Sequence, residues 1–219
     1  MMHRLERPGP GCILAEKGNP MKPSHCIGFC LFGFVMTVGH HNERLIASAH
    51  AEDHDRRSRY VAPFVPTPQE VVDRMLELAE IRHGDILYDL GSGDGRIVIT
   101  AAKKYGIKAV GFEIDPALVK VSRELIKQEG VENLAEIREQ DVMTLDLSPA
   151  SVVTMYLYPG AVLRLRPAIR SQLKPGARVV SHNYGMGDWK PEKTERLKDS
   201  AGHTRTIYLW RIEAGGETR

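Results

Sequence analysis

DILYDLGSGDGR, residues 85–96, is the most informative stretch of this sequence. Its first half is a short apolar run, which predicts a buried strand. Its second half is a turn with three closely spaced glycines, Gly91, Gly93 and Gly95, and glycine permits backbone conformations that a side chain forbids. A helical pattern over 96–105 follows directly. A strand, a glycine turn and a helix in this order predict the first unit of a parallel α/β sheet, which binds ligands beyond the carboxyl ends of its strands.

The alternation of strand and helix continues along the chain. Strand patterns occupy 108–113, 135–139, 151–157 and 178–182, and helix patterns occupy 115–129 and 159–173. Such alternation predicts a parallel sheet with helices on both faces. Near the end, 195–198 and 204–212 are separated by a short turn with no helix, which predicts an antiparallel hairpin. We therefore expect an α/β fold with a doubly wound, mostly parallel sheet.

The folded domain is expected to cover residues 60–219. Thr67 as N-cap, Pro68 at the first helical position and Glu70 at the third form a capping-box pattern, which predicts a helix start. Apolar residues then recur at helical spacing, at Val71, Val72, Met75, Leu76 and Ala79. This helix is expected to precede the strand that ends at the glycine turn.

Residues 1–59 are interpreted as an N-terminal extension. A segment of about 21–51 starts at Met21, contains the apolar stretch 26–38 and ends in Ala-His-Ala, the small-x-small form of a signal-peptidase site. This pattern resembles a secretory signal, and in that case residues 1–20 would lie upstream of the true start. The alternatives are an uncleaved membrane anchor and a disordered tail. The expected location is the cytoplasm or a membrane surface, with export as the alternative.

Composition narrows the function. A hydrophobic content of 42% and a charged content of 26% are typical of a soluble domain. The formal net charge of +2 is too small to predict a nucleic-acid partner. Cys12, Cys26 and Cys30 all lie in the extension, so the domain has neither a disulfide framework nor a cysteine-based zinc site. The histidines show no ligand spacing, and no metal is expected.

The spacing of the glycine turn separates two kinds of nucleotide site. A dinucleotide fingerprint is Gly-x-Gly-x-x-Gly, whereas this turn is Gly-x-Gly-x-Gly, with Arg96 where the last glycine of the fingerprint would stand. Asp89 precedes the turn, and an acid there suits the amino group of a methionine moiety better than it suits a pyrophosphate. A purely structural turn is the alternative. We expect Asp89, the three glycines and Ser92 to bind a cationic nucleoside.

Two further acids follow the next two strand patterns. Glu113 stands about 20 residues beyond the turn, where an acid can accept both hydroxyls of an adenosine ribose, and Ile114 beside it is a further expected contact. Asp141 is placed to accept a hydrogen bond from an adenine amino group, with Val142 as a backbone donor. The alternatives are a surface acid at Glu113 and a turn-capping role at Asp141. Three acids after successive strands predict S-adenosylmethionine as the cofactor.

This arrangement, over residues 60–212, resembles the class I S-adenosylmethionine-dependent methyltransferases. The resemblance implies a seven-stranded Rossmann-like sheet with a C-terminal antiparallel hairpin. It also implies that Asp89 and the glycine turn hold the methionine end of the cofactor, Glu113 the ribose and Asp141 the adenine.

A narrower resemblance is to the protein lysine methyltransferases that lack a SET domain. It rests on YVAPFVPTP at 60–68, DLGSGDGRIVITAA at 89–102, TMYLYP at 154–159 and KPGARVVSH at 174–182. This group includes archaeal broad-specificity enzymes and the mitochondrial enzyme that methylates the ATP synthase c-subunit, and its mitochondrial members also have an apolar N-terminal segment. The resemblance implies a protein partner and a lysine ε-amino group as methyl acceptor.

The residues after the fourth strand pattern bear on the acceptor. Residues 156–159 are YLYP, whereas adenine and glutamine N-methyltransferases have Asn/Asp-Pro-Pro-Tyr there to hold a planar nitrogen. Tyr158 is the candidate catalytic residue, because its ring face can contact an alkylammonium; packing at a helix start is the alternative. A dry aromatic channel would also favour the neutral amine that accepts a methyl group. His182, Tyr184 and Trp189 are candidates for the rim of that channel, and His182 has a structural role as its alternative.

Three other functions are compatible with the cofactor site. They are methyl transfer to a small molecule or lipid, a catalytically silent S-adenosylmethionine-binding module, and a nucleotide-dependent oxidoreductase. The glycine spacing and the terminal hairpin disfavour the oxidoreductase.

Overall fold

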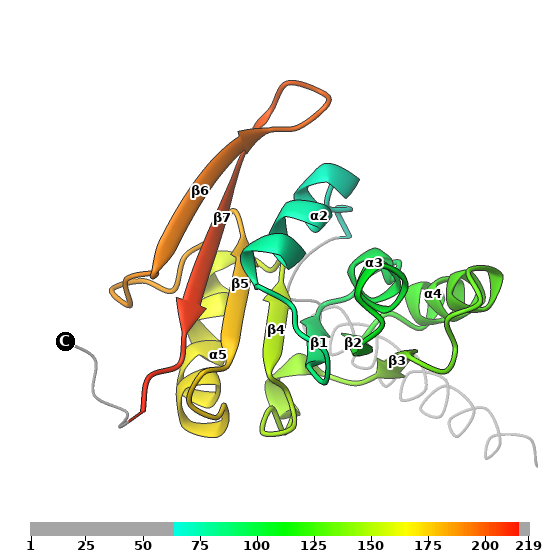
Figure 1. Cartoon of the computed structure of the whole chain (residues 1–219), viewed down its shortest axis with the longest axis horizontal. Coiled ribbons are helices and arrows are strands. Elements are labelled where there is room, and N and C mark those ends of the chain that lie inside the picture. Colours follow the sequence, from blue (N-terminus) through cyan, green and yellow to red (C-terminus); the bar gives the residue numbers. More distant parts are fainter. Residues whose placement is uncertain (1–63, 215–219) are drawn as a thin grey trace, which may run out of the picture. The chain divides into compact units, whose positions relative to one another are not determined.

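The structure, a computed structural model, describes residues 64–214. Its centre is one seven-stranded sheet in the order β3-β2-β1-β4-β5-β7-β6 (Figure 1). The strands are β1 (Ile86–Leu90), β2 (Lys108–Glu113), β3 (Ala135–Glu139), β4 (Val152–Met155), β5 (Arg178–His182), β6 (Lys193–Lys198) and β7 (Thr204–Arg211). β1 to β5 pair in parallel, and β7 pairs antiparallel with both β5 and β6. The predicted mostly parallel sheet with a C-terminal hairpin is confirmed.

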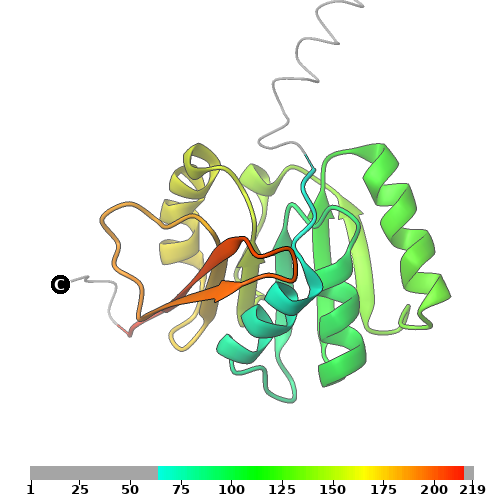
Figure 2. The ribbon, with the colours of Figure 1, turned by 90° about the horizontal axis from the view of Figure 1, so that it is seen from above.

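Helices cover both faces of this sheet (Figures 1 and 2). One face packs against α2 (Gln69–Leu78), α3 (Arg96–Tyr105) and α4 (Pro116–Gln128), and the other against α5 (Pro159–Gln172) and the 3-10 helix η1 (Val142–Thr144). Within β1, Leu87 belongs to the first core and Tyr88 to the second, because successive side chains of a strand point to opposite faces. Burial on both faces explains why β1 is apolar apart from Asp89, which lies at the end that meets the cavity.

The start of α2 differs from the prediction. Pro68 is the N-cap, and its side chain makes no capping hydrogen bond. The hydroxyl of Thr67 lies 3.2 Å from Nδ1 of the buried His182, and Glu70 accepts a hydrogen bond from the backbone N–H of Ser200. The capping-box prediction is therefore wrong, because contacts with β5 and with the β6–β7 turn occupy both side chains. The apolar stripe of this helix is buried as predicted.

The N-terminal predictions lie outside the described residues. These are the extension at 1–59, the signal or anchor segment at about 21–51 and the choice between Met1 and Met21. In the part of the chain from 64 to 214, no helix is both long and apolar enough to cross a membrane. Within the same range, no group of three or more histidine, cysteine, aspartate or glutamate side chains is arranged to hold a metal ion.

Candidate active site

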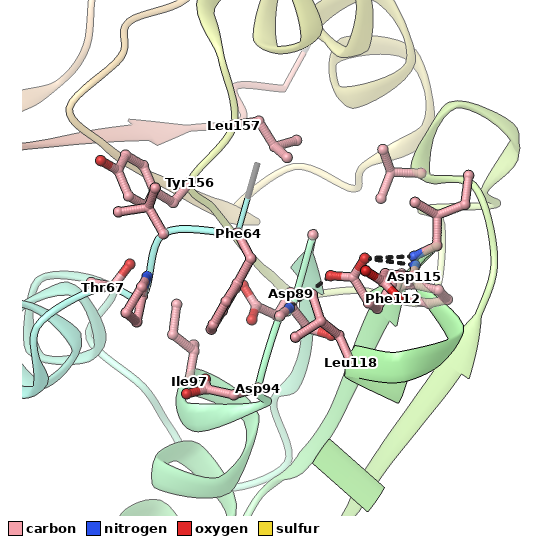
Figure 3. Close-up of a pocket in the computed structure, with 18 of the residues that line it drawn as sticks. Phe64, Thr67, Asp89, Asp94, Ile97, Phe112, Asp115, Leu118, Tyr156 and Leu157 are labelled. Atoms are coloured by element: carbon pink, nitrogen blue, oxygen red, sulfur yellow. Dashed lines mark hydrogen bonds between the residues drawn. The ribbon is translucent and has the colours of Figure 1, made fainter. Parts of the chain in front are cut away.

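A cavity of about 510 Å³ lies beyond the carboxyl ends of the first four strands (Figure 3). Its lining comes from the ends of β1 and β2, from the segments that follow β1, β2, β3 and β4, including the first turns of α3 and α4, and from residues 64–67, which we call the strap. Ligand pockets are typically about 300–1,000 Å³, so the cavity can hold a nucleoside-sized molecule. All the residues predicted to bind the cofactor, apart from Gly95, line it, and so does Tyr158.

The glycine turn has the backbone geometry that its sequence predicts. Gly91, Gly93 and Gly95 have φ values of +77°, +54° and +79°, a region that disfavours residues with a side chain. A Cβ on Gly91 would lie 2.7 Å from Leu157, and a Cβ on Gly93 would lie 2.5 Å from the ring of Phe64. Two of the three glycines are therefore in contact with other walls of the cavity. Gly95 is the N-cap of α3 and packs below the turn.

Asp89 is a buried carboxylate at the base of the cavity. It is 2% exposed, and its Oδ1 accepts a hydrogen bond of 2.8 Å from the hydroxyl of Thr154 on β4. Burial raises the pKa of the Asp89 carboxyl to about 7; the hydrogen bond from Thr154 lowers that pKa, and the carboxylates of Glu113 and Asp94 raise it. A carboxylate that burial and like charges destabilise in this way is well suited to pair with a cation.

Glu113 ends β2 and faces the same cavity. Its side chain accepts hydrogen bonds from the backbone N–H groups of Gly93 at 2.8 Å, Ile114 at 2.8 Å and Asp115 at 3.0 Å. These bonds connect the turn after β1 with the turn after β2. The surface-acid alternative is wrong, because Glu113 is 8% exposed.

The loop after β3 contributes two of the predicted residues. Asp141 is the N-cap of η1 and accepts a hydrogen bond of 2.9 Å from the backbone N–H of Met143. Asp141 therefore caps a turn, as the alternative reading of the sequence proposed. It also lines the cavity. Val142 is 6% exposed and packs in the second core beside the cavity.

Ser92 lines the cavity, but its side chain is turned away into the protein. The Ser92 hydroxyl is buried and has no hydrogen-bond partner among the described residues, and it would lie 2.6 Å from a Cβ on Gly111. Its backbone N–H donates to the carbonyl of Phe112. A glycine at position 111 of β2 is therefore required for Ser92 to fit between the turn and the sheet.

Tyrosines form the wall that follows β4. Tyr158 is 46% exposed and is the N-cap of α5, so it stands at the mouth of the cavity. Tyr156 lies deeper, with its ring centroid 4.0 Å from that of His182 and 6.2 Å from that of Tyr184. His182 is fully buried, so its prediction as a rim residue is wrong and the structural alternative holds. Trp189 is also wrong as a rim residue, because it packs against Trp210 on β7, in the second core.

The strap was not identified from the sequence as part of the site. Phe64 and Val65 are 47% and 52% exposed although both are large and apolar, and both line the cavity. Figure 3 shows Phe64 pointing into the cavity toward Asp89 and Asp94. The proximity of these two residues to the glycine turn could not be predicted, because the strap and the turn at 91–95 lie 24 to 31 positions apart in the chain. The YVAPFVPTP motif was the one available signal.

Arg96 connects the strap to the glycine turn. Its guanidinium makes a bidentate contact with Asp94, in which Nε donates to Oδ1 and Nη2 donates to Oδ2, and it donates a hydrogen bond of 2.8 Å to the carbonyl of Thr67. Arg96, which stands where a dinucleotide fingerprint would have its last glycine, therefore fixes the end of the strap.

Comparisons with known proteins agree with this geometry. The profile of the ANTKMT methyltransferase domain matches residues 89–193. A protein-lysine N-methyltransferase of Saccharolobus islandicus (strain REY15A) is 43% identical over 151 residues, which cover 68% of this chain and 93% of that protein. The ATP synthase c-subunit lysine N-methyltransferase of Rattus norvegicus is 36% identical over 190 residues, which cover 84% of this chain and 83% of that protein.

A solved structure is also similar to this chain, and the match covers nearly all of the solved chain. It is an RNA methyltransferase from Salinibacter ruber in complex with S-adenosyl-L-homocysteine. It is 51% identical and has a TM-score of 0.66, and the match covers 71% of this chain and 97% of that one. Together with the acidic cavity beyond β1 to β4, these similarities identify the chain as a class I S-adenosylmethionine-dependent methyltransferase that belongs to the family of the ANTKMT and ATP synthase c-subunit lysine N-methyltransferases.

Proposed function

We propose that this protein transfers the methyl group of S-adenosylmethionine to lysine side chains of a protein. The observation that carries the proposal is the charge of the cavity. Within residues 64–214, its lining has five carboxylates, on Asp89, Asp94, Glu113, Asp115 and Asp141, and one cationic side chain, Arg96, which is paired with Asp94. A cavity of this charge favours a cationic cofactor and a cationic acceptor side chain.

The cofactor fits the residues that are present. The ammonium group of its methionine end would pair with Asp89, where burial and neighbouring carboxylates disfavour an isolated negative charge. The three glycines and the backbone of Ser92 would allow close approach, Glu113 would accept from the ribose hydroxyls, and Ile114, Asp141 and Val142 would contact the adenosine. When bound, the cofactor supplies a methyl group on a positive sulfonium, and transfer to an amine nitrogen leaves S-adenosylhomocysteine.

On the acceptor side, the residues after β4 hold the amine rather than activate it. Only the neutral form of a lysine amine has the lone pair that forms the new bond to carbon, and its reference pKa is about 10.4. Tyr158, with its ring at the mouth of the cavity, would contact the lysine side chain as it enters. Desolvation among aromatic side chains favours loss of the ammonium proton to solvent, and alignment with the methyl group supplies much of the acceleration.

An RNA acceptor is the second candidate. It is favoured by the 51% identity to the Salinibacter ruber protein, which is described as an RNA methyltransferase. RNA binding depends on lysine and arginine side chains that neutralise phosphates, whereas acids dominate the lining of this cavity. The names of the archaeal and rat relatives favour a protein acceptor.

One labelling experiment separates these acceptors. The full chain is incubated with methyl-tritiated S-adenosylmethionine and a cell lysate, and the products are divided into protein, RNA and organic-soluble fractions. We expect the label in protein, and mass spectrometry of tryptic peptides should find it on lysine. Label that ribonuclease releases would support the RNA candidate and contradict a lysine acceptor. Label in the organic phase would indicate a lipid or small molecule, and cofactor binding without transfer would indicate a silent module.

The cofactor contacts are tested separately. Glu113→Ala should weaken S-adenosylmethionine binding at least about tenfold by calorimetry, since a hydrogen bond to a charged group contributes about 1.5–3 kcal/mol. Glu139→Ala is the matched control, because Glu139 is an exposed acid on the adjacent strand and lies outside the cavity. Equal affinities of the two variants would contradict the ribose assignment.

A further inference from the structure

The ring of Tyr156 contacts two other aromatic rings. The His182 ring lies behind it, with the two ring centroids 4.0 Å apart and the planes at 36°. The Tyr184 ring stacks at 6.2 Å and 18°. Tyr156 is partly buried and lines the cavity, whereas Tyr158 is nearly half exposed. The inner tyrosine therefore has a fixed orientation before any acceptor arrives, and a preorganised group loses little side-chain entropy when it binds.

His182, which packs against that ring, lowers the stability of the fold. It is fully buried, and its Nε2 has no hydrogen-bond partner among residues 64–214. Burial lowers its pKa to about 4, so the imidazole is neutral at physiological pH. A buried polar atom without a partner destabilises a fold, whereas an apolar ring of the same size would fill the space without that loss. The presence of histidine therefore calls for a reason other than packing.

The other nitrogen of His182 supplies that reason. Its Nδ1 lies 3.2 Å from the hydroxyl of Thr67, a contact between residues 115 positions apart in the chain. The carbonyl of Thr67 in turn accepts a hydrogen bond from Arg96, which is paired with Asp94 in the glycine turn. Figure 3 shows Thr67 and Tyr156 on the same side of the cavity. A continuous set of contacts thus runs from the cofactor turn, through the strap, to the ring of Tyr156.

We propose that Tyr156 is a second acceptor-binding residue, whose ring face receives the alkylammonium group of the acceptor, and that His182 and Thr67 are positioning residues that hold this ring. The inference rests on the proposed transfer to lysine and adds the residues that orient the amine. Ring faces attract ammonium groups, and the attraction strengthens as water is excluded. A face that is already oriented would place the amine in line with the methyl group before it loses its proton.

The ring face is tested with a probe that does not depend on the natural acceptor. Protein saturated with S-adenosylhomocysteine is titrated with n-butylammonium, and binding is followed by saturation-transfer NMR. We expect Tyr156→Phe, which keeps the ring, to bind within about twofold of wild type, and Tyr156→Leu to bind at least about fivefold more weakly. Neutral 1-pentanol should lose less affinity than n-butylammonium in Tyr156→Leu. The proposal is overturned if wild type does not bind the probe, or if the two variants bind it equally.

The positioning role is tested with a matched pair at Thr67. Thr67→Val keeps the shape of the side chain and removes the hydroxyl, whereas Thr67→Ser keeps the hydroxyl. We expect Thr67→Val to weaken n-butylammonium binding about threefold or more, with S-adenosylmethionine affinity within twofold of wild type, and Thr67→Ser to restore probe binding. Loss of cofactor affinity in step with probe affinity, or equal behaviour of the two variants, would show a merely structural role.

These tests also distinguish the inference from the function on which it rests. If the labelling experiment finds an RNA acceptor while n-butylammonium still binds wild type and Tyr156→Phe but not Tyr156→Leu, the lysine assignment fails and the ammonium-binding face stands. If lysine is labelled but Tyr156→Leu labels it with an unchanged KM and kcat, the function stands and the inference fails.

Discussion

Acidification should weaken the binding of S-adenosylmethionine through one residue, Asp89. Its carboxyl has a pKa of about 7 in the ligand-free protein, raised from 3.8 chiefly by burial. The ammonium group of the cofactor pairs with the ionised carboxylate, so binding below pH 7 must first remove a proton. The α-amino group of the cofactor has a reference pKa of about 7.7–8.0, so it is mostly protonated between about pH 5.5 and pH 7.

The size of the effect follows from the ionised fraction of Asp89. For a pKa of about 7, that fraction falls from about 0.5 at pH 7 to about 0.03 at pH 5.5. The dissociation constant should therefore rise about 16-fold over this range, which corresponds to about 1.7 kcal/mol. Calorimetry in two buffers with different ionisation enthalpies should also detect the release of about one proton per bound cofactor at pH 5.5.

The stability of the ligand-free protein should also depend on the protonation of Asp89, but it should fall as the pH rises, whereas cofactor affinity should increase. Because the folded pKa of Asp89 is above its unfolded value, the ligand-free protein binds more protons than the unfolded chain between about pH 4 and pH 7. Its contribution to the free energy of unfolding is therefore lost as the pH rises through this window. The cofactor offsets that loss, so thermal stabilisation by S-adenosylmethionine should be larger at pH 8 than at pH 5.5.

Two controls make this reasoning refutable. Asp89→Asn should bind the cofactor more weakly at pH 7, and its dissociation constant should change less than about threefold between pH 7 and pH 5.5. S-adenosylhomocysteine retains the ammonium group without the sulfonium, so its binding to wild type should show the same pH dependence as the cofactor. A dissociation constant for wild type that does not change with pH, in protein shown to be folded by circular dichroism, would refute the assignment of Asp89.

Two further predictions concern the turn and the opposite end of β1. Gly93→Ala should lower the free energy of unfolding by about 1–2 kcal/mol in chemical denaturation, because φ of Gly93 is +54°, and it should also weaken cofactor binding. Adding Phe64→Ala to this variant should recover part of the stability, since the new methyl group would lie 2.5 Å from the Phe64 ring. No recovery in the double variant would contradict the contact. Asp85→Asn should lower the free energy of unfolding by about 3–5 kcal/mol, because it leaves the buried guanidinium of Arg178 without its carboxylate. Cofactor affinity should be unchanged, because Asp85 lies outside the cavity. A loss of affinity in this variant would contradict the independence of the ion pair from the cofactor site.

Local patterns were sufficient to predict most of the fold. The strand at 108–113 and the helix at 96–105 have the predicted bounds, and α4, which Asp115 caps, lies within the predicted 115–129. Each of these features depends on neighbours in sequence, such as a glycine after a helix or an aspartate before a proline. The acids after successive strands could also be placed at one edge, because parallel strands bring their carboxyl ends together.

Partners distant in sequence were not predicted. Thr67 has the sequence signature of an N-cap, but its hydroxyl contacts His182, and no local pattern reports that contact. His182 at a strand end is compatible with either a rim or a buried position, and packing against Tyr156 decides between them. The strap was missed for the same reason. Sequence periodicity identifies which face of an element is buried, but it does not identify what lies across from that face.

The two buried side-chain atoms that lack a partner within residues 64–214 lie directly behind two walls of the cavity. Ser92 is behind the glycine turn, and His182 is behind the ring of Tyr156. At the opposite end of the sheet, Asp85 and Arg178 are also buried, but they satisfy each other and nearby backbone groups. Natural folds tolerate unsatisfied groups chiefly where function requires a particular arrangement. The destabilisation caused by these two unsatisfied atoms is therefore concentrated at the carboxyl ends of the strands, where the turn must approach the cofactor and the proposed ring face must be held for the amine.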